Sequence, residues 1–330
     1  MKLRSTHNPS LPFIKQGWTG NSLNEKNQYL NLDGASERSF RELLKWQTEA
    51  NPLKGLKRKQ TAGVEVITGS SFAKSTEDGF TWLGHASFLF TLSGKQFITD
   101  PVLYNVGPVK RHTALPCSVG ELRQIDFILL SHNHRDHADA KSMQQLCALN
   151  PNAIILTGLE IGNLLRSWKI SNPVIEAGWY QQYNIDADIT VTYLPAKHWN
   201  RRGLTDMNEM LWGSFMLQSP QHTVYFGADS GMGVHFEDIS TLFPSIDYAL
   251  LGIGAYKPEW FMHTAHTSPA DVLRAQQQLG AGQLVPMHHS TFDLSDEPIF
   301  YPKQELMQLQ EDQAIDTVLH LAIGQKHFLG

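Results

Sequence analysis

The feature that most constrains the fold is a cluster of four metal-ligand side chains placed directly after a short apolar run. Residues 125–130 are almost continuously apolar, which is typical of a strand buried on both faces. His132, His134, Asp136 and His137 follow at once. Binding sites in open α/β sheets lie beyond the carboxyl ends of strands. The pattern therefore predicts a sheet with ligand side chains at one edge.

The spacing within this cluster divides it into two parts. His132 and His134 are two residues apart, so on an extended backbone their side chains point the same way. The chain must then turn, which directs Asp136 and His137 toward a second point. This arrangement suits two metal ions about 3.5–4 Å apart. Because imidazole and carboxylate select such ions, the predicted cofactors are two divalent metals, with zinc favoured and iron or manganese as alternatives.

Four side chains cannot complete two coordination shells, so further ligands must lie downstream. Each of them should again sit at the end of an apolar strand, where a side chain is held rigidly. Three residues meet this condition, each after a separate apolar segment: His198, Asp229 and His288.

The chain divides into an irregular start and a longer region of alternating elements. Residues 1–75 are polar, with one expected helix at residues 39–46, and are interpreted as an N-terminal extension. Residues 76–330 are interpreted as one domain of sheets covered by helices, because no linker interrupts them. The expected strands are 80–83, 87–92, 96–99, 125–130, 153–157, 189–194, 212–217, 222–227, 247–253 and 283–287, and the expected helices are 139–149, 159–168 and 268–279.

Charge and hydropathy limit the classes of partner and the cellular location that we expect for the chain. The formal net charge is −5 and the one basic block is Lys54–Lys59, so no nucleic-acid partner is expected. The N-terminus lacks the apolar segment of a secretory signal, and no window approaches the roughly 18 apolar residues of a membrane span. We therefore expect a cytoplasmic protein, and leave open contact with the inner face of a membrane. The oligomeric state is also open, with a homodimer among the alternatives.

Several short stretches around the expected ligands match a known pattern. They are 82–86 (WLGHA), 99–101 (TDP), 130–139 (LSHNHRDHAD), 195–199 (PAKHW), 211–214 (LWGS), 226–231 (FGADSG), 252–262 (GIGAYKPEWFM) and 287–292 (MHHSTF). Over roughly residues 79–300 the chain thereby resembles the metallo-β-lactamase superfamily. It is most similar to the branch that includes N-acyl-phosphatidylethanolamine phospholipase D and bacterial lactonase-like relatives.

The resemblance implies an α/β fold in which two sheets are enclosed by helices, the αββα sandwich. It implies that the first metal is held by three histidines: His132, His134 and His198. It implies that the second metal is held by Asp136, His137 and His288, and that Asp229 bridges both. A water between the ions would act as hydroxide and attack the substrate. Asp136 would orient this nucleophile or pass a proton to the leaving group.

Three more residues gain expected roles from the resemblance. His266, just before an expected helix, matches a histidine placed to donate to a substrate oxyanion, with capping or packing as the alternative. Asp100 is expected to hold the second nitrogen of a ligand histidine. His85 is expected to lie near the metals, and a packing histidine in the sandwich is the alternative.

The substrate pocket is expected to be aromatic. Trp199, Tyr256, Trp260 and Phe261 are candidates for the wall of an acyl-chain groove, and the last three fall in a loop of the kind that often lines binding sites. His289 follows the last expected ligand at a position where lipid hydrolases of the human type carry a Trp, which alters this part of the wall.

Four functions compete. The favoured one is a phosphodiesterase that cleaves a phospholipid-like diester of the N-acyl-phosphatidylethanolamine type, because two metals can clamp the attacking and leaving oxygens. The alternative is a lactonase or amide hydrolase acting on a small soluble substrate. A nuclease of the same fold is disfavoured because the chain is acidic and lacks a basic stripe. A metal-binding protein without catalysis is disfavoured because all seven ligand positions carry ligand-type residues.

Overall fold

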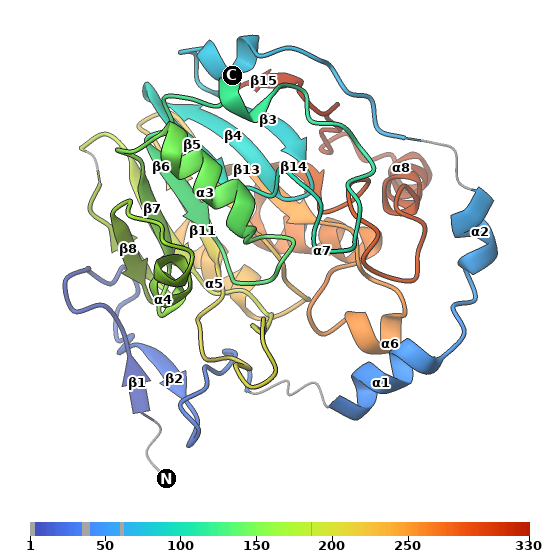
Figure 1. Ribbon diagram of the computed structural model, residues 1–330, viewed down its shortest axis with the longest axis horizontal. Helices are drawn as coiled ribbons and strands as arrows, with labels where there is room; N and C mark the ends of the chain where they lie inside the picture. The colour runs from blue at the N-terminus through green and yellow to red at the C-terminus, as the bar shows by residue number, and fades with distance from the viewer. Residues whose placement is uncertain (1–3, 35–39, 60–62, 186) are drawn as a thin grey trace.

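A computed structural model of the chain describes residues 4–34, 40–59, 63–185 and 187–330 (Figure 1). Its strands are β1 (Arg4–Thr6), β2 (Asn21–Leu23), β3 (Gly79–Gly84), β4 (Ser87–Leu92), β5 (Lys95–Thr99), β6 (Phe127–Leu130), β7 (Ile154–Gly158), β8 (Val174–Ala177), β9 (Gln181–Tyr183), β10 (Thr190–Leu194), β11 (Ser214–Gln218), β12 (Thr223–Phe226), β13 (Ile246–Gly252), β14 (Ala281–Met287) and β15 (Lys326–Phe328). Its α-helices are α1 (Phe40–Thr48), α2 (Lys54–Lys59), α3 (Ala140–Leu149), α4 (Ile161–Ser167), α5 (His235–Leu242), α6 (Glu259–Met262), α7 (Pro269–Leu279) and α8 (Tyr301–Gln313).

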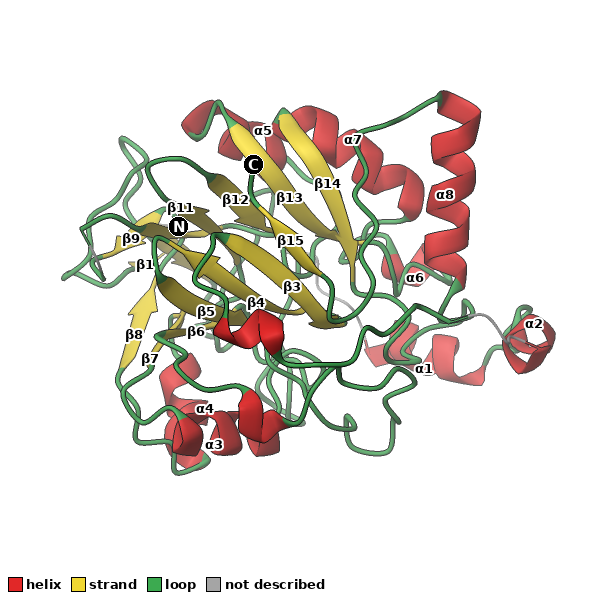
Figure 2. Cartoon of the chain, turned by 90° about the horizontal axis from the view of Figure 1, so that it is seen from above, coloured by secondary structure: helices red, strands yellow, loops and turns green. Residues whose placement is uncertain are grey.

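Two stacked sheets form the centre of the molecule. One has the strand order β15-β3-β4-β5-β6-β7-β8, and the other has the order β14-β13-β12-β11-β10-β9. Figure 2 shows α5 and α7 on the outer side of the second sheet and α3 and α4 on the outer side of the first. This layering is the αββα sandwich, so the predicted fold class is confirmed.

Strand β4 illustrates how the sequence fills both sides of its sheet. Phe88, Phe90 and Leu92 belong to the core cluster between the two sheets, whereas Leu89 belongs to the cluster beneath α3 and α4. The side chains alternate because successive residues of a strand point to opposite faces. The face of Leu89 also carries Ser87 and Thr91, which are buried and donate to the backbone oxygens of Asp100 and Ser75.

The predicted elements between residues 79 and 287 are confirmed with small shifts at their ends. One shift has a clear cause: the strand expected at 212–217 begins at Ser214. Leu211 N donates to Leu159 O and Gly213 N donates to Ser131 O, so the preceding residues cross to the other sheet before β11 starts. Strands β8, β9 and β15 and helices α5 and α8 were not predicted.

The first part of the chain packs on the outside of the sandwich. Strands β1 and β2 pair with each other, and Phe13 forms a bridge with Gln181 of β9. The helix expected at 39–46 is observed as α1, although Ser39 lies outside the described residues. The division at residue 75 stays a prediction. Within the described ranges, no helix combines the length and the apolar character needed to cross a membrane.

Candidate metal centre

The loop after β6 turns sharply and so presents its four ligand-type residues in two directions. Ser131 begins it, donating from its N and Oγ to the Asp100 carboxylate at 2.7 and 2.6 Å. The backbone N–H groups of His137 and Ala138 then donate to His134 O at 3.1 and 2.8 Å. This turn separates the residues before His134 from those after it, and α3 starts directly behind the loop.

The first group of converging donors consists of His132, His134, His198 and Asp229, whose donor atoms lie within 4.8 Å of one another. His134 Nδ1 lies 3.0 Å from His132 Nε2 and 3.1 Å from His198 Nε2. His198 comes from the loop after β10 and Asp229 from the loop after β12. The structure thus brings together residues from three strand ends, which is where the sequence predicted the ligands.

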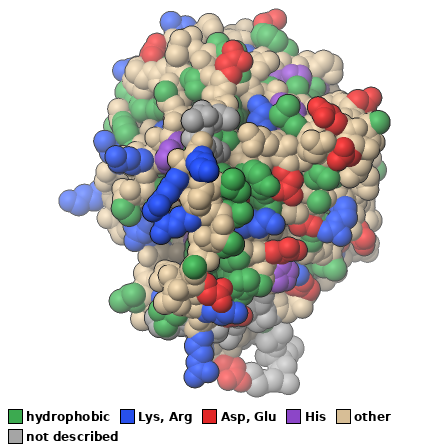
Figure 3. All heavy atoms as spheres, turned by 90° about the vertical axis from the view of Figure 1, so that its right-hand side faces the viewer, with side chains coloured by type: hydrophobic (Ala, Val, Ile, Leu, Met, Phe, Trp, Pro, Cys, Tyr) green, Lys and Arg blue, Asp and Glu red, His purple; other side chains and the backbone are tan. Residues whose placement is uncertain are grey.

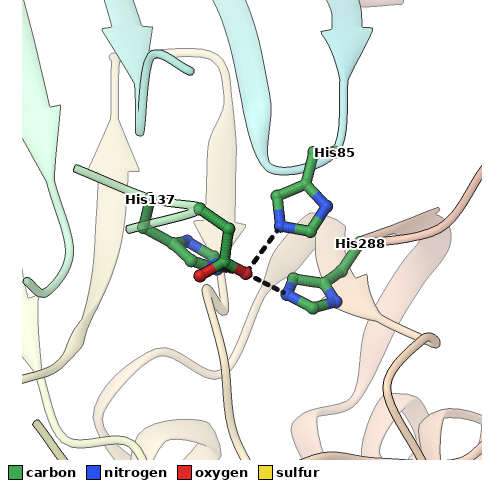
Figure 4. A group of neighbouring side chains, drawn as sticks. His85, His137 and His288 are labelled. Atoms are coloured by element: carbon green, nitrogen blue, oxygen red, sulfur yellow. Dashed lines mark hydrogen bonds and ion pairs between the residues drawn. The ribbon is translucent and has the colours of Figure 1, made fainter. Parts of the chain in front are cut away.

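The second group consists of Asp136, His137, His288 and His85, again within 4.8 Å (Figure 4). Asp136 Oδ2 lies 3.0 Å from His85 Nε2 and 3.4 Å from His288 Nε2. Figure 4 shows both imidazoles aimed at the same carboxylate, with His137 behind it. His85 comes from the turn between β3 and β4 and adds a nitrogen to the three expected donors.

Asp229 lies between the two groups. Its Oδ1 is 3.1 Å from His288 Nε2, and its Oδ2 is 3.2 Å from His137 Nε2. The same Oδ2 is 3.9 Å from His132 Nε2 and 3.8 Å from His198 Nε2. The carboxylate is almost fully buried and faces both groups, which is the position that a bridging ligand would need.

The hydrogen bonds behind these imidazoles show that the donor set fits cations. His198 Nδ1 lies 2.9 Å from Ala265 O, a carbonyl that can only accept, so this nitrogen carries the proton. His137 Nδ1 lies 2.8 Å from Asp100 Oδ2, which fixes the proton there in the same way. In the neutral ring the Nε2 lone pair of His137 therefore faces Asp229 Oδ2, a carboxylate oxygen, at 3.2 Å. Such an arrangement is repulsive unless positive charge lies between the atoms.

The pKa values show which groups of the site carry charge. Burial would raise the pKa of Asp229, but His137 and His288 outweigh it and hold that pKa well below its usual range. The pKa of Asp136 is also held well below its usual range, because His137 and the hydrogen bonds from His288 and His85 outweigh the effect of burial. Burial lowers the pKa of His132 well below its usual value and keeps that ring neutral. Against the effect of burial, Asp229 raises the pKa of His137 well above its usual value and the pKa of His288 to about 9, so a metal would displace protons from these two rings.

His266 reaches the cluster from the segment between α6 and α7. Its Nδ1 lies 3.8 Å from Asp229 Oδ2, and its ring centroid is 5.2 Å from that of His198 and 5.5 Å from that of His288. Its side chain is partly exposed, so it is accessible beside the two groups of donors. The structure thus places His266 beside the donors, and its contact with substrate stays a prediction.

The four expected pocket residues have different surroundings. The Trp199 ring lies 4.5 Å from the His134 ring, beside the first donor group. Tyr256 is buried and its hydroxyl donates to Glu305 of α8, so that end of the side chain faces α8. Trp260 and Phe261 belong to α6. Their roles in a substrate pocket stay predictions.

Some supporting residues were not found from the sequence. Ser131 connects two parts of the site, since its Oγ contacts both Asp100 and His132 Nδ1 at 2.6 and 2.8 Å. Thr291 Oγ1 accepts from the His85 backbone N at 2.8 Å and so fixes the turn that carries this histidine. A serine directly before a ligand histidine at a strand end was the one available signal for the first contact.

Comparisons with known proteins agree with this geometry. Residues 95–289 match the beta-lactamase superfamily domain. The chain is 31% identical over 80% of its length, and 80% of the relative's, to the N-acyl-phosphatidylethanolamine-hydrolyzing phospholipase D 1 of Caenorhabditis elegans. It is 32% identical over 70% of its length to the mitochondrial N-acyl-phosphatidylethanolamine-hydrolyzing phospholipase D of Saccharomyces cerevisiae, of which it spans 51%.

A solved structure shows the same fold at lower identity. The isothiocyanate hydrolase from Delia radicum gut bacteria superposes with a TM-score of 0.64 at 19% identity, covering 76% of this chain and 98% of that one. The domain match, the relatives and this fold all agree with a buried set of histidine and aspartate donors able to hold metal. The chain therefore belongs to the β-lactamase superfamily and is a metal-dependent hydrolase of the metallo-β-lactamase fold.

Proposed function

We propose that the chain is a dinuclear metal-dependent phosphodiesterase that cleaves phospholipid-like diesters of the N-acyl-phosphatidylethanolamine type. The observation that carries the proposal is the position of Asp229 between two groups of donors, each able to hold a cation. The relatives that hydrolyse N-acyl-phosphatidylethanolamine, as their names state, support the choice of substrate. Two adjacent cations suit displacement at phosphorus because they stabilise both the attacking and the leaving oxygen.

The ligands in this proposal are those expected from the sequence. His132, His134 and His198 would hold the first ion, and Asp136, His137 and His288 would hold the second. Asp229 would bridge them. The donor set of imidazole and carboxylate favours zinc. When bound, two such ions would lower the pKa of a water between them and stabilise negative charge on the substrate.

The chain's own residues would then position the reactants and move protons. The Asp136 carboxylate would orient the attacking water and pass its proton toward the leaving oxygen. His266, partly exposed beside Asp229, would donate to a non-bridging phosphate oxygen. Asp100 would keep the proton of His137 on Nδ1 and leave Nε2 free to bind metal.

The same donors would also serve carbonyl chemistry, so a lactonase or amide hydrolase acting on a small soluble substrate is the competing function. The two can be separated by comparing zinc-loaded protein on three substrates. These are N-acyl-phosphatidylethanolamine vesicles, a soluble bis-aryl phosphate and a simple lactone. We expect release of phosphatidic acid from the lipid and hydrolysis of the aryl phosphate, without hydrolysis of the lactone.

The matched variants are Asp229→Asn and Asp312→Asn. Asp229 lies between the donor groups, whereas Asp312 is exposed on α8. The first should lose phosphodiesterase activity while it remains folded, and the second should retain it. Hydrolysis of the lactone alone, by protein that holds metal, would replace the phosphodiesterase with the competing function.

A further inference from the structure

The N-terminal arm, defined here as α1, α2 and the residues between them (40–59), is attached to the part of the molecule that borders the metal site. The Trp46 ring stacks on Phe261 of α6 at 5.1 Å, and Trp46 Nε1 donates to Asp296 Oδ1 at 3.1 Å. Asn51 Nδ2 donates to Asp296 O at 2.9 Å, and Lys57 pairs with Asp293. The arm is therefore fixed to α6 and to the loop that follows the last expected ligand.

The side of the arm that faces away from these contacts is both basic and apolar. Helix α2 has no buried residue, and Lys54, Arg58 and Lys59 are exposed on it. Leu56, in the middle of the same helix, is 52% exposed. Figure 3 shows Lys and Arg side chains gathered on the left of this face of the molecule.

Apolar side chains are also exposed on α1 and α6. Leu44 is 43% exposed and Trp260 is 38% exposed. Lys45 Nζ lies 4.3 Å from the centre of the Trp260 ring, so a cation and an indole share one place on the surface. Tryptophan next to lysine is the combination that settles at the boundary between lipid headgroups and acyl chains.

The charge of α2 is opposite in sign to that of the whole chain. The chain carries a formal net charge of −5, whereas the sequence of α2, KGLKRK, contains four cations and no acid. Lys57 is used in the contact with Asp293, and this leaves the three exposed cations to face a partner. Their partner should be a negatively charged surface, and the neighbouring apolar residues favour one with an apolar layer beneath the charges.

We propose that the N-terminal arm, together with Trp260, is a docking surface for anionic phospholipid bilayers. Lys54, Arg58 and Lys59 provide the electrostatic attraction, and Leu56, Leu44 and Trp260 enter the headgroup layer. The arm is fixed to α6, so docking holds the neighbouring Phe261 and the segment leading to the metal site close to the membrane. This docking surface rests on the proposed function, because only that function makes a membrane lipid the substrate.

The experiment measures co-sedimentation of the full chain with vesicles of phosphatidylcholine, with and without added phosphatidylglycerol. The chain should bind the anionic vesicles, bind the neutral ones weakly, and dissociate as salt is raised. In the variant K54Q/R58Q/K59Q the partition coefficient should fall on the order of 100-fold, since each cation near an anionic surface contributes about fivefold. The control K26Q/R123Q/K169Q removes the same charge from exposed positions elsewhere and should bind as the wild type does.

The apolar contribution is tested separately with Leu56→Gln and Trp260→Ala, both of which should weaken binding at high salt more than at low salt. All variants change exposed side chains, and their thermal unfolding should match the wild type. Equal binding of K54Q/R58Q/K59Q and the wild type to anionic vesicles would overturn the proposal. So would a preference for duplex DNA over anionic vesicles, which would assign the basic helix to nucleic acid instead.

The outcome can be separated from that of the proposed function. Vesicle binding is measured on His132→Ala protein, which should dock without hydrolysing lipid. Hydrolysis of a soluble bis-aryl phosphate should be the same in the wild type and in K54Q/R58Q/K59Q, while hydrolysis of vesicle lipid should fall in the variant. Docking without any diester hydrolysis would remove the proposed function and retain the docking surface. Diester hydrolysis without docking would remove the docking surface and retain the proposed function.

Discussion

Replacing Asp100 with Asn should impair the proposed metal site that contains His137 more than the one that contains His132. The carboxylate is fully buried and accepts three hydrogen bonds, from Ser131 N at 2.7 Å, Ser131 Oγ at 2.6 Å and His137 Nδ1 at 2.8 Å. Asparagine has the same shape and tolerates the left-handed backbone of this position, where φ is +32°. The substitution therefore changes hydrogen bonding with little change in packing.

The expected effect follows from the proton on His137. An amide NH₂ facing Nδ1 would donate to it and move the ring proton to Nε2, the nitrogen that faces Asp136 and Asp229. A protonated Nε2 cannot bind metal. Loss of such a supporting partner typically lowers metal affinity by about 10–100-fold. This corresponds to about 1.4–2.8 kcal/mol of binding free energy.

The assay is competition for zinc against a chelator of known affinity, followed through both binding steps. Asp100→Asn should weaken the step that uses His137 by this full amount and the other step less, because the carboxylate reaches His132 only through Ser131 Oγ. Asp126→Asn is the control: its carboxylate accepts from Gln96 N, near the start of β6 and away from the donors. Two unchanged steps in Asp100→Asn would refute the argument that this carboxylate sets the His137 tautomer.

Three further predictions test other parts of the structure. His85→Phe should lower metal content more than His85→Gln, which can still donate to the neighbouring carboxylate; equal metal content in both would argue against that contact. Burial lowers the pKa of His235 to about 3 from 6.5, so unfolding takes up a proton below pH 6.5 and stability falls as pH drops, by about 2 kcal/mol at pH 5. Denaturant titrations should show that His235→Gln loses this part of the pH dependence. In Gly254→Ala the added Cβ would lie 2.0 Å from His288 O, so thermal unfolding should show a loss of about 1–3 kcal/mol together with reduced metal content. Gly120→Ala, whose nearest contact would be 3.8 Å, should show neither effect.

The sequence predicts much of the sandwich because its strands are covered on both faces. Apolar runs such as those of β6 and β12 are typical of buried strands, and His132 and Asp229 follow shortly after them. The proximity of the seven expected ligands follows from this one rule of placement at strand ends. The structure places them in two groups, as the spacing within residues 132–137 indicated.

Elements with little apolar signal could not be predicted in this way. Strands β9 (Gln181–Tyr183) and β15 (Lys326–Phe328) have three residues each, too few for a pattern of alternation. Helix α8 buries only Pro302 and Leu306 among its described residues, so its sequence lacks a continuous apolar stripe. These elements form because neighbouring strands and helices provide surfaces for them, and that information is not local.

The position of His85 is the clearest case at the site. It was expected near the metals only because residues 82–86 match the family pattern, and periodicity alone does not distinguish it from a packing histidine. Its contact with Asp136 depends on a turn with φ of +56° and on the hydrogen bond to Thr291, which is far away in the chain. The docking of α1 on α6 through Trp46 and Phe261 is likewise a long-range contact that no local pattern indicates.

The most direct test of the account is a count of bound metal in purified, zinc-loaded protein by elemental analysis. The wild type should hold about two ions per chain, as two donor groups require. His198→Ala and His288→Ala each remove one donor from one group, and each should reduce the count to about one. A single ion in the wild type, or loss of the same ion in both variants, would contradict the account of two adjacent sites bridged by Asp229.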